Sequence, residues 1–314
     1  MKIIKTENVN CPYCRDDEYV IIARGKDFEC NLSNQEFTMV RCKNCGLIRL
    51  NPRPKINELN FIYSPTYNAY IFESKLGKLM KFFRSYYLRR MIIPLKKIIP
   101  NNATILEGGC GDGEFLLNLK KYGSFNWKLI GNDISETAKE KLENASIEFH
   151  PGRFEDLDKK DKFDVVILKD VIEHLDQPGK VFKDVSDKLK LNGLFIIETP
   201  NPDSWDAHIF RKRYWAGWHF PRHWTIYNKS QINEHLIENG FEIIKITPNL
   251  SPVSWLYSIK YYLSEKKFFT KFAFLFDERF FISTAFFYFI NLLQIILTNE
   301  TSNMQIFARK VKNE

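Results

Sequence analysis

The sequence predicts an α/β fold with a mostly parallel sheet, preceded by a small cysteine-bearing segment. Three observations support this prediction. From residue 104 onward, short apolar runs alternate with stretches of helical period. Such alternation is typical of parallel strands joined by crossover helices. A glycine-rich turn follows the first of these strands, and two C-x-x-C pairs lie within the first 45 residues.

The expected elements follow in chain order. Short strands are expected around Tyr19–Ala23 and Phe37–Val40, and a helix over 71–99. Ser230 is placed to cap the last helix of the alternating region and Gly240 to end it. The predicted strands of that region lie near 104–107, 127–133, 146–150, 163–168, 194–199 and 241–246, and the predicted helices near 113–122, 135–143, 178–190 and 230–239.

The glycine-rich turn spans residues 107–113, with the sequence EGGCGDG. Glycines at a strand-to-helix turn let the backbone bend sharply and approach a ligand. Asp133, twenty residues after the last glycine, ends the next predicted strand, where an acid can hold both hydroxyls of a ribose. A dinucleotide site of the form G-x-G-x-x-G would need a glycine at position 114, where the chain has Glu114. The spacing therefore favours another nucleoside over a dinucleotide, with an ordinary tight turn as the alternative.

This turn resembles motif I of the class I S-adenosylmethionine-dependent methyltransferases, and the resemblance covers roughly residues 100–250. It implies a Rossmann-like seven-stranded methyltransferase sheet, with residues 304–310 as a last, antiparallel strand at its edge. Four further stretches resemble motifs of the same family, in the family's order: residues 131–135, 154–157, 163–175 and 191–198.

The resemblance also implies S-adenosyl-L-methionine as the cofactor. Glu107 would orient its methionine part, Asp133 its ribose, and Lys169 would line the pocket through its backbone. Arg153 replaces an aspartate that many relatives carry, so adenine recognition would depend on the Phe154 amide and the Glu155 carboxylate. The expected cofactor-binding residues are Glu107, Gly109, Gly111, Asp133, Ile134, Phe154, Glu155 and Lys169.

The two C-x-x-C pairs predict a metal site. Cys11 and Cys14 form the first pair, Cys42 and Cys45 form the second, and 27 residues separate the two pairs. Two residues between thiolates let both sulfurs reach one ion, and four thiolates in a tetrahedral arrangement select structural zinc, with iron left open. Cys30 and Cys110 remain outside the set. The resulting zinc ribbon resembles one found on methyltransferases of sugar and surface-glycan pathways.

An aromatic loop after the fifth strand of the predicted sheet is expected to bind the methyl acceptor. It runs over residues 199–224 and contains His219 and His223, with Pro221 between them arguing against a helical metal pair. Each histidine is a candidate acceptor ligand or general base, or else a hydrogen-bonded structural residue. His174, beside the pocket in the family pattern, is a third candidate for orienting the acceptor.

Composition adds expectations about partners. The net charge of +8 and the basic residues within 71–99 favour anionic partners. Residues 280–297 are uncharged over eighteen positions, the lower limit for crossing a bilayer. Because a strand is expected to return to the sheet afterwards, this segment is expected to be a buried helix, a homodimer face, or an insertion into one membrane leaflet. No secretion signal is apparent, so we expect a cytoplasmic protein, peripheral to the inner membrane face.

The leading hypothesis is a methyltransferase acting on a small polar or glycan-type acceptor, at a sugar hydroxyl or carbon, with the acceptor carried by a nucleotide or a lipid. One rival is an RNA methyltransferase, disfavoured because no N-P-P-Y-like tetrapeptide follows the fourth strand. Another is a non-catalytic zinc-binding scaffold. The expected units are a zinc ribbon (1–54), a basic helical linker (55–100), a cofactor domain (101–250 with 302–314) and an apolar helical insertion (251–301).

Overall fold

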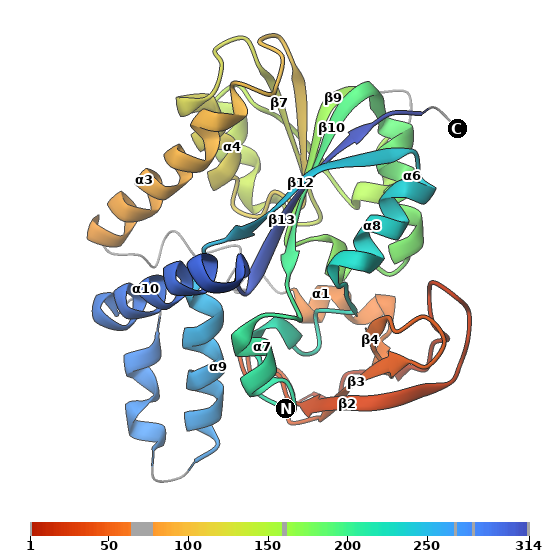
Figure 1. The fold of residues 1–314 in the computed structure, drawn as a ribbon, viewed down its shortest axis with the longest axis vertical. Coiled ribbons are helices and arrows are strands. Elements are labelled where there is room, and N and C mark those ends of the chain that lie inside the picture. The colour runs from red at the N-terminus through yellow and green to blue at the C-terminus, as the bar shows by residue number, and fades with distance from the viewer. Residues whose placement is uncertain (1, 64–77, 159–161, 267–268, 278–279, 313–314) are drawn as a thin grey trace.

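The computed structural model describes residues 2–63, 78–158, 162–266, 269–277 and 280–312. Among these, the largest sheet has seven strands in the order β12-β13-β10-β9-β6-β7-β8 (Figure 1). The five strands from β10 to β8 are parallel, while β13 is antiparallel to both β10 and β12. Their bounds are β6 Thr104–Gly108, β7 Lys128–Asp133, β8 Glu148–Pro151, β9 Phe163–Lys169, β10 Leu189–Pro200, β12 Phe241–Asn249 and β13 Asn303–Lys310.

The predicted seven-stranded α/β sheet is therefore confirmed, with one correction. The last strand, β13, does not lie at the edge of the sheet, because β12 pairs with its other side. The edge position belongs to β12.

Helices cover both faces of the sheet because successive strand residues point to opposite sides. In β9, Val165 and Ile167 belong to one buried cluster, whereas Val166 and Leu168 belong to the other. The first cluster is covered by α3 (Lys78–Leu95), α4 (Glu114–Tyr122) and α5 (Lys139–Asn144), and the second by α6 (Pro178–Lys188) and α8 (Lys229–Glu238).

One detail of the predicted helices changes. The cap of α8 is Asn228 and not Ser230: Gln231 N–H donates to Asn228 Oδ1 at 2.9 Å, and Asn228 N–H donates to Gln231 Oε1 at 3.1 Å. This reciprocal pair satisfies two amide donors at once, which Ser230 cannot do from inside the first turn. Of the helix predicted over 71–99, residues 71–77 lie outside the described part of the chain.

The N-terminal segment builds a second sheet together with a strand from much later in the chain. Its order is β11-β4-β3-β2, with β2 Tyr19–Gly25, β3 Phe37–Cys42, β4 Ile48–Leu50 and β11 Thr225–Ile226. A smaller pair joins β1 (Thr6–Glu7) to β5 (Arg53–Pro54). The core of this region combines Phe37 and Met39 with Trp215, Trp218 and Trp224. The N-terminal segment and the aromatic loop therefore fold as one unit, with short helices α1 (Leu59–Ile62) and α7 (Trp205–Phe210) beside them.

A helical unit is inserted between β12 and β13. It consists of α9 (Pro252–Ser264), a 3-10 helix (Thr270–Phe276) and α10 (Phe281–Thr298) (Figure 1). Within the described ranges, α10 is the one helix whose length and mean hydropathy of 1.8 would suit a membrane crossing, and 17% of it is buried in the protein.

Candidate functional site

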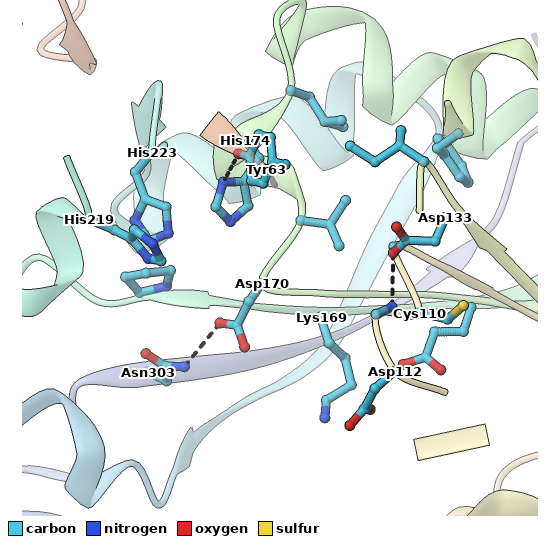
Figure 2. Close-up of a pocket in the computed structure, with 18 of the residues that line it drawn as sticks. Tyr63, Cys110, Asp112, Asp133, Lys169, Asp170, His174, His219, His223 and Asn303 are labelled. Carbon is cyan, nitrogen blue, oxygen red and sulfur yellow. Dashed lines mark hydrogen bonds between the residues drawn. The ribbon is translucent and has the colours of Figure 1, made fainter. Parts of the chain in front are cut away.

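A cavity of about 530 Å³ opens at the carboxyl ends of β6, β7 and β9. In open α/β sheets, ligands bind at this edge. One end of the cavity is lined by the glycine-rich turn and Asp133, and the other by His174, His219 and His223. In Figure 2, Asp170 lies between His219 and His223 on one side and Asp133 on the other.

The glycine-rich turn needs glycine for two reasons. Gly109, Gly111 and Gly113 have φ values of 67°, 58° and 76°, in the region that side chains disfavour. A Cβ at Gly109 would also lie 2.4 Å from Val171 Cγ2. The turn after β6 therefore lies directly against the residues that follow β9.

Asp133 ends β7 with its carboxylate fixed by backbone amides. Gly111 N–H donates to Oδ2 at 2.8 Å (Figure 2), and Ser135 N–H donates to Oδ1 at 2.8 Å. Burial raises the pKa of Asp133 to about 6, although these amides act in the opposite direction. The carboxylate lines the cavity in the position from which it can accept hydrogen bonds from a ribose diol.

Glu107 is buried in the cavity wall at the end of β6, and no donor among the described residues reaches its Oε2. Burial raises its pKa to about 8, while Lys169 lowers it. A buried carboxylate oxygen without a partner costs free energy unless a ligand supplies a donor. The ammonium of an amino-acid ligand would supply one, so the site fits the methionine part of S-adenosylmethionine.

Lys169 contributes its side chain to the cavity, in addition to the backbone role expected from the sequence. Its Nζ lies 3.6 Å from Glu198 Oε2 and 4.4 Å above the ring centre of Phe115. The ammonium therefore partly balances the cluster of carboxylates around the cofactor end.

The residues expected to bind adenine do not all present free side chains to the cavity. Ile134 is half exposed, whereas the Phe154 ring is buried in the core and packs where Gly108 lacks a side chain. Arg153 Nη2 donates to Glu155 Oε1 at 3.0 Å and also bonds Asp176. Glu155 is thus paired within the protein, which leaves the backbone around Phe154 as the nearer source of adenine contacts.

The three histidines expected at the acceptor loop are brought together. Ring centroids of His174 and His223 lie 4.6 Å apart, and those of His219 and His223 lie 4.8 Å apart. His223 Nδ1 lies 2.7 Å from Gly217 O, while His174 Nδ1 lies 2.8 Å from the Tyr63 hydroxyl and 3.1 Å from Arg222 O. His174 is thus fixed by neighbours from other segments of the chain, and His223 by the backbone of its own loop.

Burial and neighbouring imidazoles keep two of the rings neutral. Burial, followed by the charge of His219, lowers the pKa of His174 to about 3. Burial also lowers the pKa of His223 well below its usual range. The third ring, His219, contacts an acid: its Nε2 lies 3.0 Å from Glu29 Oε2. Neutral imidazoles of such low pKa are weak bases, and they are better suited to hydrogen bonding than to accepting a proton.

Asp170 is a site residue that the sequence reasoning did not select. It follows β9 with a φ of 52°, and its N–H donates to Glu198 O at 2.8 Å. Asn303 Nδ2 donates to its Oδ1 at 3.2 Å (Figure 2). The side chain of Asp170 lines the cavity. Desolvation there, followed by the charge of Glu198, raises its pKa to about 7. Its position immediately after a predicted parallel strand could have identified it from the sequence.

Glu29, Tyr63 and Tyr257 also line the cavity and were not predicted. Glu29 and Tyr63 come from the N-terminal segment and Tyr257 from α9. Nothing in their local sequence distinguishes them, because only the tertiary fold brings them to the cavity.

The four cysteines of the C-x-x-C pairs converge away from this cavity. Cys11 Sγ lies 3.5 Å from Cys45 Sγ, and Cys14 Sγ lies 3.4 Å from Cys42 Sγ. All four sulfurs lie within 4.8 Å of one another, so they can hold one ion. Cys30 and Cys110 do not belong to this group.

Comparison with known proteins supports the assignment of the larger sheet. The family described as a methyltransferase domain matches residues 80–246, more than half of the chain. The ubiquinone biosynthesis O-methyltransferase of Bradyrhizobium diazoefficiens is 28% identical over 155 residues, covering 46% of this chain and 60% of that protein. That of Rickettsia canadensis is 32% identical over 149 residues, covering 44% and 62%. The chain thus spans about three fifths of these curated relatives.

Among solved structures, a SAM-dependent methyltransferase from Archaeoglobus fulgidus superimposes with a TM-score of 0.47 at 23% identity. The superposition covers 76% of this chain and 98% of that one. A likeness of this size carries no argument about substrate.

Proposed function

Because the chain belongs to the methyltransferase domain family, we propose that it is an S-adenosylmethionine-dependent class I enzyme and that it methylates a ring hydroxyl of a small polar acceptor. The acceptor binds at the histidine end of the cavity. The placement of Asp170 between the two ends of one cavity is the observation that supports this proposal most directly.

When bound, S-adenosylmethionine supplies an activated methyl group on a sulfonium, which is a good leaving group. Glu107 would hold the cofactor's ammonium and Asp133 its ribose diol, while Gly109 and Gly111 let the backbone approach. Ile134, the backbone at Phe154 and Lys169 complete this end. The protein then has to position the acceptor oxygen and exclude water.

Asp170 is the group best placed to take the acceptor's proton. Its neighbour Val171 touches Gly109, so Asp170 lies beside the turn that holds the cofactor. A pKa near 7 matches a general base at neutral pH. The proton on the hydroxyl would pass to the Asp170 carboxylate as the oxygen forms its bond to the methyl carbon.

His174, His219 and His223 would position the acceptor through their ring nitrogens. The relatives named above are called O-methyltransferases, which favours oxygen over carbon as the accepting atom. Tyr63, Trp224 and Tyr257 line the same end of the cavity, and aromatic faces suit polar rings. This chemistry is shared by sugars and by hydroxylated aromatic rings, whether nucleotide-linked or lipid-linked.

We propose that the four cysteines hold a structural zinc ion. Zinc–sulfur bonds of about 2.3 Å in a tetrahedron place the sulfurs about 3.8 Å apart, close to the 3.4 and 3.5 Å found here. The Trp224 N–H donates to Glu173 O at 2.8 Å. The N-terminal sheet is thereby linked to the segment that carries His174, so the metal would stabilise the acceptor end from outside.

The test is to incubate the protein with methyl-labelled S-adenosylmethionine and separate pools of nucleotide sugars, lipid-linked saccharides and hydroxylated quinone precursors. Label on an acceptor oxygen in one pool is the expected result, and it identifies the source of the ring. Label only in ribosomal RNA fragments would instead establish an RNA methyltransferase. Failure to bind S-adenosylhomocysteine would indicate a non-catalytic scaffold.

A further inference from the structure

α10 presents an apolar surface to solvent. Ile282 is 72% exposed, Phe289 57% and Ile296 78%. With Phe286 and Leu297, which are also exposed, these residues recur at the spacing of one helix side and form the apolar face of α10. Phe274 and Phe280, whose rings lie 6.2 Å apart, extend this surface onto the preceding 3-10 helix.

The opposite side of α10 is buried, and two of its three buried side chains are polar. Asn291 and Gln294 are both fully buried. Ser251 N–H donates to Asn291 Oδ1 at 2.8 Å, and Trp255 Nε1–H donates to Gln294 Oε1 at 3.1 Å. The helix is thus inverted relative to a helix of a water-facing protein, with its hydrogen-bonding side chains inside and its large apolar side chains outside. It is not the buried helix that one reading of the sequence allowed.

We propose that α10 lies in the plane of an anionic membrane surface, with its apolar face inserted into one leaflet. A helix with one wide apolar face and basic residues beside it is suited to this position. Large contiguous apolar patches on a protein surface mark sites of interaction.

The ends of α10 keep it from crossing the bilayer. Its first residue follows the 3-10 helix that packs on α9, and Trp255 of α9 stacks on Phe287 with ring centroids 5.7 Å apart. Its last turn is followed by Asn299, with φ of 53°, and then by β13 inside the sheet. Both ends are therefore held on the same side of the membrane, which leaves insertion into one leaflet.

Charge favours an anionic leaflet. Lys271 is exposed on the 3-10 helix that contacts α10, and Arg89 and Arg90 are exposed on α3. The Tyr87 hydroxyl of α3 donates to Asn249 Oδ1, two residues before Ser251, whose N–H donates to Asn291 of α10. This chain of hydrogen bonds connects α3 to the start of the helical insertion.

Among the described residues, two acids close to α10 are paired with lysines of the protein. Lys260 Nζ lies 2.8 Å from Asp277 Oδ2, and Lys229 Nζ lies 2.5 Å from Glu300 Oε1. A second copy of the chain related by a two-fold axis would bring its own cations to the same face, so like charges would oppose pairing. Anionic headgroups meet no such opposition.

Docking in this way would place the acceptor end of the cavity near the membrane. Val253, Ser254 and Tyr257 of α9 line the cavity, while Trp255 of the same helix packs on α10. An acceptor anchored in the leaflet would then enter beside α9. This consequence rests on the proposed function, whereas the docking itself does not.

The test is co-sedimentation of the full chain with vesicles of phosphatidylcholine alone, and with vesicles in which roughly a third is phosphatidylglycerol. We expect the protein to bind the anionic vesicles and to bind the neutral ones at least ~5-fold more weakly. Phe289→Glu and, separately, Ile282→Glu should each reduce binding to anionic vesicles by ~10-fold or more, because a charge would enter the apolar layer.

Phe125→Glu is the matched control. Phe125 is 93% exposed in the turn before β7, at the edge of the sheet opposite the cavity, and its replacement introduces the same charge. S-adenosylhomocysteine binding verifies that each variant is folded, independently of methyl transfer. No sedimentation of the parent protein with either vesicle, or equal binding by all three variants, would overturn the proposal. So would a dimer in light scattering that Phe289→Glu dissociates in the absence of vesicle binding.

Discussion

The two ends of the cavity differ in the charge and the hydrogen bonding of the side chains that line them. At the cofactor end, Glu107 and Asp133 are buried carboxylates held by their own strand ends, and Glu107 Oε2 has no donor among the described residues. At the acceptor end, His174 and His223 are neutral rings already bonded to backbone carbonyls. The first end is suited to a ligand that brings charge and donors, and the second to a neutral ligand held by hydrogen bonds to ring nitrogens and by aromatic contacts. Asp170 lies between them.

The largest loss of activity is expected from replacing Asp170, which lies between the two ends of the cavity. Asp170→Asn removes the base and keeps the shape, so methyl transfer should fall by ~10²–10⁴-fold. Affinity for S-adenosylhomocysteine, measured by calorimetry, should change little because Asp133 and Glu107 are untouched. The parent protein should lose activity as the pH falls below about 7, where Asp170 becomes protonated.

Asp203→Asn is the control for Asp170→Asn, because Asp203 is exposed and lies outside the cavity. Equal losses of transfer and cofactor affinity in Asp170→Asn would show that the residue belongs to the cofactor end.

The second largest effect is expected from loss of the metal, which should impair the two ends of the cavity to different extents. Cys42→Ser would remove one thiolate from the cluster and destabilise the N-terminal sheet by ~3 kcal/mol or more. The acceptor end should be impaired first, since Glu29 and Tyr63 come from that segment, while S-adenosylhomocysteine binding persists. Zinc content and thermal unfolding measure the change. Cys30 lies outside the cluster, so Cys30→Ser should retain the zinc content and the thermal stability of the parent protein.

Asp133→Asn should weaken the cofactor end alone. Loss of charge-assisted hydrogen bonds to the ribose costs about 2 kcal/mol, or ~30-fold in affinity. Isothermal titration with S-adenosylhomocysteine measures this loss. An unchanged affinity would mean that the nucleoside sits elsewhere.

Cofactor affinity should depend on pH through Glu107. Its pKa of about 8 lies above the ordinary value, so without a ligand the group is mostly protonated at neutral pH. An ammonium favours the charged form, so binding releases a proton and affinity should rise with pH up to about 8, by at most ~10-fold per unit. Calorimetry in buffers of different ionisation enthalpy detects this proton. Glu107→Gln should abolish its release.

The smallest expected effect is at the outer histidine. Glu29→Gln would weaken the contact with His219 Nε2 and raise the acceptor KM by ~5-fold, about 1 kcal/mol, with kcat nearly unchanged. Steady-state kinetics with the identified acceptor measure both. A loss confined to kcat would assign the pair a role in proton transfer instead.

The contrast between the ends also explains what the sequence could predict. Glu107, Gly109, Gly111 and Asp133 lie in two short stretches whose spacing follows from strand–turn–helix geometry, so local pattern suffices to locate them. The cysteine pairs are local in the same way. The α/β sheet was predictable for this reason too, although the position of β13 inside it was not, because pairing partners are chosen by tertiary packing.

The acceptor end has no comparable signature. Glu29, Tyr63, Asp170, His219 and Tyr257 meet only after β11 has joined the N-terminal sheet and α9 has closed the cavity. His174, His219 and His223 could be suggested from the sequence, but not the burial that keeps His174 and His223 neutral. The Asn228 cap was missed because Ser230 is an equally good cap by residue type, and only the backbone decides between them.

The most direct test of the two-ended cavity is a crystal structure of the protein with S-adenosylhomocysteine. We predict that the ribose hydroxyls contact the Asp133 carboxylate, the ammonium reaches Glu107 Oε2, and the sulfur faces Asp170. A nucleoside bound among His174, His219 and His223, or a sulfur turned away from Asp170, would contradict the account.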